Sequence, residues 1–379
     1  MNIVFLSRFD LKNINDWSGT MYHVYNKLKE KHFIKIIGTE ILKQFSTFKK
    51  RNFSENTFIP AEHYVQNLGK CLSDRIKVVE CDLIFFGDIF FNNSDFNFPY
   101  VLLSDMTFEQ IIIHYKNRKP DERHVEHGYN LERKALNSAC RIIYSSEWIK
   151  QKAIEFYQID PKKIEVVEFG ANIPEPDNYS IDIACDFCRL LFVGMDWERK
   201  NGDLVLQLFE LLKKDGFPCT LTIIGSVPNE DVEEDDDLTI IPFLDKSDPD
   251  DLKRFCQILS ESHFLVLPTK FDAFGIVFCE ASAYAVPSIA ADVGGVPQAV
   301  KEGKNGYLLP PDSTAADYAE KIKTVFNDKE GYLKLRQSSR YEYETRLNWD
   351  VWGEKVNKIL EDAVNQWKME NGEWRIPKG

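Results

Sequence analysis

Two acidic residues in the C-terminal half of the chain have the surroundings of a ligand site. Asp272 follows the apolar run 263–268, and Glu280 comes later in the same segment among apolar residues. A carboxylate in apolar surroundings is costly unless it is hydrogen-bonded or paired with a cation. Glu280 therefore either accepts hydrogen bonds from ligand hydroxyls, such as the vicinal diol of a ribose, or forms a buried ion pair. Gly275 lacks a side chain, so backbone amides near it can approach a ligand closely.

Two adjacent basic residues form a second candidate site. Arg199 and Lys200 follow the apolar run 189–194 and precede the helical segment 202–213. A helix N-terminus carries unpaired N–H groups and the positive end of the helix dipole, so this junction favours an anion such as a diphosphate. The alternative is that both basic side chains are exposed in a loop.

Two junctions that contain glycine are weaker candidates. Gly19 lies between the first apolar run and the first helical segment, and Gly294 and Gly295 follow the run 287–290. Glycine lets the backbone approach a phosphate or a sugar, although turn formation alone also explains these residues. The segment around Gly19 does not read G-x-G-x-x-G, so the main signature of a dinucleotide-binding oxidoreductase is missing.

Apolar runs that alternate with amphipathic segments predict the elements that position these residues. In the first half, strand-type runs lie at 3–6, 34–37, 83–86, 100–103, 141–144 and 164–169, and helical segments include 107–117 and 128–139. In the second half, strand-type runs lie at 189–194, 219–225, 238–242, 263–268 and 287–290, with helical segments at 202–213, 248–261 and 275–286. This alternation is typical of parallel sheets covered by helices. We therefore predict an α/β protein with two doubly wound, Rossmann-like domains.

The expected domain linker is the proline-rich polar segment 173–178. We predict an N-terminal domain over 1–175 and a C-terminal domain over 176–349. The final segment, 350–379, begins with a helix that is apolar on one face, and the N-terminal domain is a candidate for covering that face. In open α/β sheets, ligands bind at the carboxyl ends of the strands, where the candidate junctions would lie.

The composition narrows the function further. The chain has 47 Lys and Arg against 60 Asp and Glu, and its net charge is -13. A negative chain is not attracted to the phosphate backbone of duplex nucleic acid. No apolar stretch is long enough to span a bilayer, no cleavable leader is evident, and the eight cysteines are scattered. We expect a cytoplasmic protein that does not bind nucleic acid. The sequence also shows no Asp-x-Asp motif after a strand and no cysteine set at zinc spacing, so we expect no metal site.

Together these motifs resemble the donor half of a family 4 retaining glycosyltransferase of the GT-B fold, over most of residues 186–310. The E-x7-E motif of that family appears here as Asp272 and Glu280. By this resemblance, Glu280 holds the ribose hydroxyls of a nucleotide sugar, and Asp272 with the amides that follow it holds the sugar hydroxyls and the diphosphate. The donor-binding residues implied in this part of the chain are Asp272, Ala273, Phe274, Gly275, Glu280 and Gly295.

The resemblance also implies roles for the basic residues. Members of the family tend to carry an arginine directly after the strand glycine and a lysine further along, both on the diphosphate. Lys200 matches the lysine, but Met195 stands in the first position, and Arg199 is the candidate substitute. Leu244 belongs to the loop where the family places the base, largely through backbone contacts.

The implied activity is sugar transfer from a nucleoside-diphosphate sugar to an acceptor hydroxyl, with retention at the anomeric carbon. A UDP-sugar is the favoured donor and a GDP-sugar the second choice. Lys200 and Asp272 would act at the reacting groups, and the charge of the leaving diphosphate would be stabilised electrostatically. The resemblance implies neither a metal nor another cofactor, and it implies two Rossmann-like domains that face a central cleft.

The acceptor stays open, with a glycan, a lipid and a small molecule as candidates. Asp105 ends a strand of the first series and either orients the acceptor or the sugar 6-hydroxyl, or caps the helix that follows. The aromatic run 85–91 is either a buried strand with its loop or a wall that faces the acceptor. The basic segment 43–51 is either a peripheral membrane contact or a surface loop.

Two other functions fit the same motifs. A nucleotide-sugar epimerase of GT-B shape would keep the nucleotide site and need no acceptor. A non-catalytic protein that binds a nucleotide sugar would tolerate the loss of the arginine at Met195.

Overall fold

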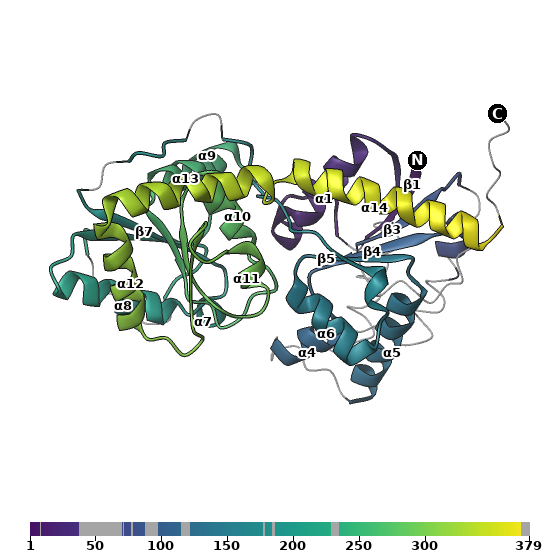
Figure 1. The fold of residues 1–379 in the computed structure, drawn as a ribbon, viewed down its shortest axis with the longest axis horizontal. Helices are drawn as coiled ribbons and strands as arrows, with labels where there is room; N and C mark the ends of the chain where they lie inside the picture. The colour runs from purple at the N-terminus through teal and green to yellow at the C-terminus, as the bar shows by residue number, and fades with distance from the viewer. Residues whose placement is uncertain are drawn as a thin grey trace. The chain divides into compact units, whose positions relative to one another are not determined.

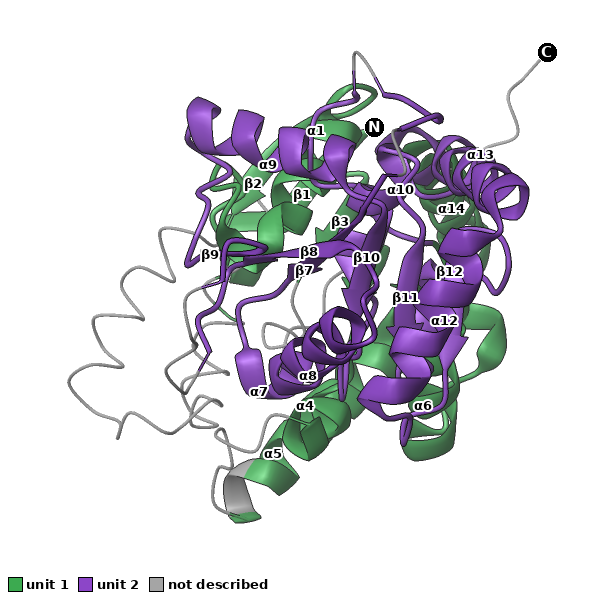
Figure 2. Cartoon of the chain, turned by 90° about the vertical axis from the view of Figure 1, so that its left-hand side faces the viewer, with its two compact units in different colours: residues 1–167, 353–379 green, residues 168–352 purple. Residues whose placement is uncertain are grey.

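The computed structural model describes residues 1–7, 9–37, 70, 72–76, 79–87, 98–114, 122–176, 179–183, 186–228 and 235–372. The chain divides into two compact units, which Figure 2 shows in different colours. Unit 1 comprises Met1–Val167 and Gly353–Gly379, and unit 2 comprises Glu168–Trp352. The basic segment 43–51 and most of the aromatic run 85–91 lie outside the described residues.

Unit 1 is built on a six-stranded sheet in which all neighbouring strands are parallel, in the order β2-β1-β3-β4-β5-β6. Its strands are β1 (Asn2–Leu6), β2 (Phe33–Ile37), β3 (Leu83–Phe86), β4 (Tyr100–Ser104), β5 (Arg141–Tyr144) and β6 (Ile164–Val166). Its helices are α1 (Thr20–Lys29), α4 (Phe108–His114), α5 (Glu122–Ser138) and α6 (Glu147–Tyr157), with the 3-10 turns η1 (Asp16–Gly19) and η3 (Pro161–Lys163). Every residue of β3 is buried, as expected for a parallel strand covered on both faces.

Unit 2 repeats this plan with a second parallel sheet, in the order β12-β11-β10-β7-β8-β9. Its strands are β7 (Cys188–Val193), β8 (Cys219–Ile224), β9 (Leu238–Ile241), β10 (Phe264–Leu267), β11 (Ser288–Ala291) and β12 (Gly306–Leu309). Its helices are α7 (Trp197–Lys200), α8 (Gly202–Lys214), α9 (Pro249–Glu261), α10 (Ile276–Ala283), α11 (Val296–Ala299), α12 (Ala315–Asn327) and α13 (Lys329–Thr345). Helix α8 packs against α12 and α10 packs against α13, and these two pairs cover opposite faces of the sheet (Figure 1).

The prediction of two doubly wound, Rossmann-like α/β domains is confirmed by the two parallel sheets with helices around them. The sequence did not predict β12 or the two long helices α12 and α13. Helix α5 begins at Glu122, earlier than the expected start at residue 128. These differences lie at the edge of one sheet and on the surface, and they leave the positions of the candidate junctions unchanged.

The C-terminal helix α14 (Trp349–Glu370) contains the second change of unit, between Trp352 and Gly353. The first change lies between Val167 and Glu168, so both boundaries differ from the expected ones at 175/176 and 349/350. The apolar face of α14 is fully buried at Trp352, Val356, Leu360 and Ala363. Although α14 has 22 residues, neither it nor another helix of the described ranges is apolar over the length needed to cross a bilayer.

Candidate functional site

The candidate residues of unit 2 gather at the carboxyl ends of β7 and β10, which are adjacent and parallel. The order of the sheet reverses between these strands, because β7 continues to β8 on one side and β10 continues to β11 on the other. Ligands of open α/β sheets bind outside the strand ends at such a reversal. The junction after β7 and the junction after β10 therefore lie together at the expected ligand position.

Arg199 and Lys200 belong to α7, a single helical turn between β7 and α8. Asp196 caps this turn, since its Oδ1 accepts a hydrogen bond from the Arg199 N–H at 3.1 Å. Asn201, in the left-handed conformation with a φ of 60°, ends α7 and begins α8. The side chains of Arg199 and Lys200 are only 20% and 10% exposed, so the alternative of an exposed basic pair in a loop is wrong.

Both basic side chains contact Asp272, and we call these three residues the Lys200–Asp272 cluster. Lys200 Nζ lies 2.6 Å from Asp272 Oδ2, and Arg199 Nη1 lies 3.3 Å from Oδ1. Arg199 Nη1 also donates to the carbonyl oxygen of Phe271 at 2.9 Å. Burial lowers the pKa of the Lys200 ammonium and outweighs the opposite effect of Asp272. The sequence placed these residues in two separate junctions, and the fold brings them into one buried charge cluster.

Glycines allow close backbone packing around this cluster. The Gly295 N–H donates to the carbonyl oxygen of Asp272 at 2.9 Å. A Cβ on Gly294, which has a φ of +53°, would lie 2.3 Å from the same oxygen. The aliphatic stem of Lys200 crosses Gly194, where an added Cβ would lie 2.7 Å from Lys200 Cγ. The Gly294–Gly295 junction therefore packs directly on the Asp272 segment.

Glu280 lies on α10 and is 2% exposed. Its Oε1 accepts a hydrogen bond from Lys246 Nζ at 2.5 Å, so the ion-pair alternative for this carboxylate is the one that the structure contains. Sequence reasoning pointed to the loop of Lys246 only for backbone contacts and missed this side chain. The need of a buried acid for a cation was visible in the sequence, but the partner comes from a junction across the sheet.

The other predicted residues of unit 2 line the start of α10 and the loop after β9. Ala273 and Phe274 are buried, and the Phe274 ring packs edge-on against Phe169 at 5.5 Å between centroids. Gly275 begins α10 with a φ of +89°, a conformation that strains other residues. Leu244 is buried in the loop that also carries Lys246.

Met195, at the position where the family tends to carry an arginine, is 75% exposed. It follows Gly194 at the carboxyl end of β7 and contributes no charge there. The cations at this strand end are therefore Arg199 and Lys200, both already in contact with Asp272.

The two predicted residues of unit 1 lie near Trp17. The Trp17 indole N–H donates to Asp105 Oδ2 at 3.2 Å. Trp17, Ser18 and Gly19 all have positive φ, at 48°, 54° and 88°, directly before α1. Left-handed residues in succession are costly for side chains other than glycine. This strained turn holds the Trp17 indole against Asp105.

The capping role that was one alternative for Asp105 is taken by other residues. Helix α4 begins at Phe108, whose N–H donates to Glu132 Oε2 at 2.7 Å. Thr107 Oγ1 accepts from the Gln110 N–H at 3.3 Å, which is the geometry of an N-cap. The interpretation of Asp105 as the cap of this helix is therefore wrong.

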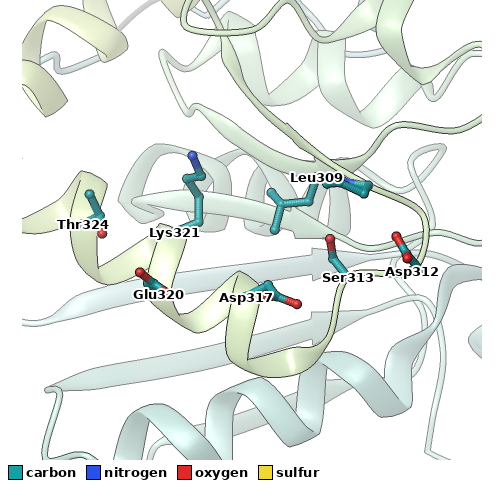
Figure 3. Close-up of a pocket in the computed structure, with 8 residues that line it drawn as sticks. Leu309, Asp312, Ser313, Asp317, Glu320, Lys321 and Thr324 are labelled. Carbon is teal, nitrogen blue, oxygen red and sulfur yellow. The ribbon is translucent and has the colours of Figure 1, made fainter.

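A pocket of ≈ 530 Å³ lies beside α12, and none of the residues that line it is a predicted site residue (Figure 3). Its lining residues are Leu309, Pro310, Asp312, Ser313, Asp317, Glu320, Lys321 and Thr324. Asp317 is already engaged in the capping box of α12 with Thr314. Within the described ranges, no group of three or more His, Cys, Asp and Glu residues is arranged to hold a metal ion.

Comparisons with known proteins agree with this geometry. Residues 186–346 match the model of the family described as glycosyl transferases group 1. The chain is 27% identical over 259 residues to a D-inositol 3-phosphate glycosyltransferase of Streptomyces bingchenggensis, covering 62% of this chain and 56% of that protein. It is 26% identical over 256 residues to the capsular polysaccharide biosynthesis glycosyltransferase CapM of Staphylococcus aureus, covering 63% of this chain and 66% of CapM. The chain thus spans little more than half the length of the first of these relatives.

Solved structures with the same fold cover almost the whole chain. A glycosyltransferase from Rickettsia africae matches with a TM-score of 0.69 at 16% identity, over 96% of this chain and 98% of that one. HepE from Anabaena, in complex with UDP-glucose, matches with a TM-score of 0.63 at 13% identity, over 96% of this chain and all of the other.

The two parallel sheets and these neighbours define the fold as GT-B, with two Rossmann-like domains. Residues 186–346, which take up most of unit 2, match the family described as glycosyl transferases group 1. The resemblance drawn from the motifs between Phe192 and Gly295 is confirmed.

Proposed function

We propose that this protein transfers a sugar from a nucleoside-diphosphate sugar to an acceptor hydroxyl, with retention at the anomeric carbon. The observation that carries the proposal is the Lys200–Asp272 cluster, in which two cations and a carboxylate are held at the reversal of a parallel sheet. Cations held in a largely dry position stabilise a diphosphate more strongly than exposed ones would.

Each residue of the cluster has a part in this proposal. Lys200 and Arg199 would contact the diphosphate from the positions in which Asp272 holds them, and their charge would stabilise the negative charge that gathers on it as the sugar departs. Asp272 holds both cations in place, and it would bind sugar hydroxyls together with the backbone amides of Ala273, Phe274 and Gly275. The transfer would then need neither a metal ion nor another resident cofactor.

The nucleoside would occupy the neighbouring loops. Glu280 would accept from ribose hydroxyls, the backbone around Leu244 would contact the base, and Gly295 would border the diphosphate. A UDP-sugar is our favoured donor and a GDP-sugar the second, and the UDP-glucose complex of HepE supports the first choice by analogy.

Unit 1 would supply the acceptor side. Asp105, held by the Trp17 indole, would orient the acceptor or the sugar 6-hydroxyl. The backbone at Gly19 would bind the donor, by contact with a phosphate or the sugar. The names of the relatives point to hydroxyls of small polar molecules and glycans as acceptors, and a lipid acceptor at a membrane surface is the third proposal.

The test is a thermal-shift panel with UDP-, GDP- and ADP-sugars on the wild type and on Glu280→Ala and Lys200→Ala. We expect one nucleotide class to stabilise the wild type and both variants to lose that stabilisation. Lys213→Ala is the matched control, because Lys213 also pairs with carboxylates of unit 2, on the surface. Equal shifts in the wild type and the two site variants would remove the proposed donor site.

A product assay with donor alone separates transfer from epimerisation. A transferase without an acceptor hydrolyses the donor slowly and does not change the identity of its sugar, whereas an epimerase converts it to another nucleotide sugar. A donor that binds tightly and stays wholly inert would instead indicate a binding protein.

A further inference from the structure

The ion pair between Lys246 and Glu280 is held more tightly than a surface pair. Glu280 is 2% exposed and the Lys246 side chain 20% exposed, with 2.5 Å between Nζ and Oε1. The same ammonium lies 4.7 Å from the centre of the Phe255 ring on α9. A carboxylate and an aromatic face therefore fix the Lys246 charge from two elements, α10 and α9.

The backbone that carries Lys246 is fixed on both sides. Asp245 Oδ1 accepts from the N–H and the hydroxyl of Ser247, at 2.8 and 2.6 Å. The Asp245 N–H donates to Asp251 Oδ2 at 2.9 Å, and Asp248 caps the N-terminus of α9. Because this turn is ordered by its own hydrogen bonds, Lys246 meets Glu280 from a set direction.

The two oxygens of Glu280 differ. Oε1 is bound by Lys246, whereas Oε2 accepts no hydrogen bond from the part of the chain that the structure describes. Oε2 is also not one of the fully buried polar atoms that lack a partner, so the small exposed part of Glu280, 2% of the residue, includes this oxygen. A buried ion pair does not by itself indicate a gain in stability, because apolar residues of similar size in its place often stabilise a protein equally well.

We propose that Lys246 is a positioning residue of the nucleoside site. It balances the charge of Glu280 and holds the carboxylate by Oε1, so that Oε2 points to a ribose hydroxyl and accepts its hydrogen bond. This inference rests on the proposed function and adds a specificity-determining residue to it. Lys246 then decides how well the site distinguishes a ribonucleotide from one without ribose hydroxyls.

The test compares the affinities of UDP and 2′,3′-dideoxy-UDP, and of GDP and its dideoxy analogue, by titration calorimetry. Hydrogen bonds to a charged acceptor predict that the wild type prefers the ribonucleotide roughly 10- to 100-fold. In Lys246→Met we expect this preference to fall to about threefold or less, while the affinity for the dideoxy analogue stays unchanged. Lys246→Arg should restore most of the preference, because it returns a cation to Oε1.

Lys213→Met is the matched control, since Lys213 also pairs with carboxylates and lies 5.5 Å from a phenylalanine ring of the same unit. It should keep the wild-type preference. Lys246→Gln serves if the methionine variant does not fold, and the same loss is expected in it.

A folded Lys246→Met or Lys246→Gln protein that keeps the full preference overturns the inference, and so does an equal loss of affinity for both nucleotides. Wild type that binds ribo- and dideoxynucleotides equally overturns it too, but leaves the diphosphate site at Lys200 standing. Wild type that binds neither nucleotide removes the proposed function itself, and this inference with it.

Discussion

Glu280 in unit 2 and Glu132 in unit 1 are both buried glutamates, yet their partners differ. Glu280 is bound to the Lys246 ammonium. Glu132, on α5, is 1% exposed and has no basic partner among the described residues; it accepts from the Phe108 N–H at the start of α4. Burial raises the pKa of Glu132 to about 8. The carboxyl of Glu132 is therefore mostly protonated at neutral pH.

This difference separates a buried acid that can serve a ligand from one that serves the fold. A cation supplied from another junction balances the charge of Glu280 through one oxygen, and in our proposal the other oxygen binds the ligand. The partner of Glu132 is a backbone amide of the adjacent helix, so this acid completes a helix start. Asp272 belongs with Glu280, because Lys200 and Arg199 balance its charge.

The largest expected effect comes from removing a cation that pairs with a buried acid of unit 2. Lys200→Ala removes the cation closest to Asp272 and to the proposed diphosphate, while Glu132→Gln changes a buried acid outside that site. We expect Lys200→Ala to lower kcat/KM for donor turnover roughly 100- to 1,000-fold, as the loss of a group that stabilises developing charge does in other enzymes. Glu132→Gln should stay within about threefold of the wild type. The measurement is release of the nucleotide from the preferred donor.

A comparable loss in both variants would contradict the distinction, because it would show that buried charge matters wherever it lies. Circular dichroism of both variants confirms that each is folded before the rates are compared.

A second, smaller effect tests whether the Lys246–Glu280 pair is mutually dependent. Glu280→Gln leaves the Lys246 ammonium without its counter-charge in a position that is 20% exposed. We expect the free energy of unfolding to fall by about 2–3 kcal/mol, somewhat less than for a pair with both partners fully buried. Urea unfolding followed by tryptophan fluorescence measures it.

The control for this prediction is Asp215→Asn, which breaks the exposed pair with Lys323 of similar length, 2.6 Å. Exposed ion pairs contribute little to stability, so this variant should unfold almost as the wild type does. If the free energy of unfolding falls by the same amount in both variants, burial does not make the Lys246–Glu280 pair more important for stability than an exposed pair.

The architecture could be predicted from the sequence because the central strands of the sheets are clear, continuous apolar runs. Continuous apolar runs such as 263–268 and 189–194 mark buried parallel strands, and they correspond to β10 and β7. The edge strand β12 has a partly exposed pattern of four residues, which does not differ from a loop by periodicity alone. This edge strand and the two helices that follow it, α12 and α13, are the part of the fold that was missed.

The candidate site was predicted residue by residue but not as a set of contacts. Lys200, Asp272 and Glu280 are the residues that the pattern singled out, and their separate junctions meet as the sheet order requires. Which cation balances which acid depends on side-chain directions at strand ends, and the sequence does not contain these explicitly. The same limit explains the wrong capping role for Asp105, since the helix begins at Phe108 and its cap is Thr107.

A third prediction concerns Glu132, the buried acid that has no basic partner among the described residues. Because the pKa of Glu132 is raised from an ordinary 4.5 to about 8, the folded chain binds more protons than the unfolded chain between these values. The contribution of this group to stability is therefore complete at low pH and is lost as the pH rises through that window. Glu132→Gln should gain stability relative to the wild type between pH 5 and pH 8, by up to about 1.4 kcal/mol per pH unit. Urea unfolding at four pH values measures this difference.

A difference that stays constant with pH would show that Glu132 titrates alike in both states.

The smallest expected effect concerns metal removal. At the paired site the carboxylates of Asp272 and Glu280 already face Lys200, Arg199 and Lys246, so a divalent cation would have to displace an ammonium or guanidinium group to reach them. In the proposed mechanism the same cations supply the charge that a metal ion would otherwise bring to the diphosphate. We expect EDTA to change the rate of donor turnover by less than about twofold, and added Mg²⁺ to leave it unchanged. A rate that falls with EDTA and returns with Mg²⁺ would mean that a metal, and not Lys200 with Arg199, stabilises the leaving diphosphate.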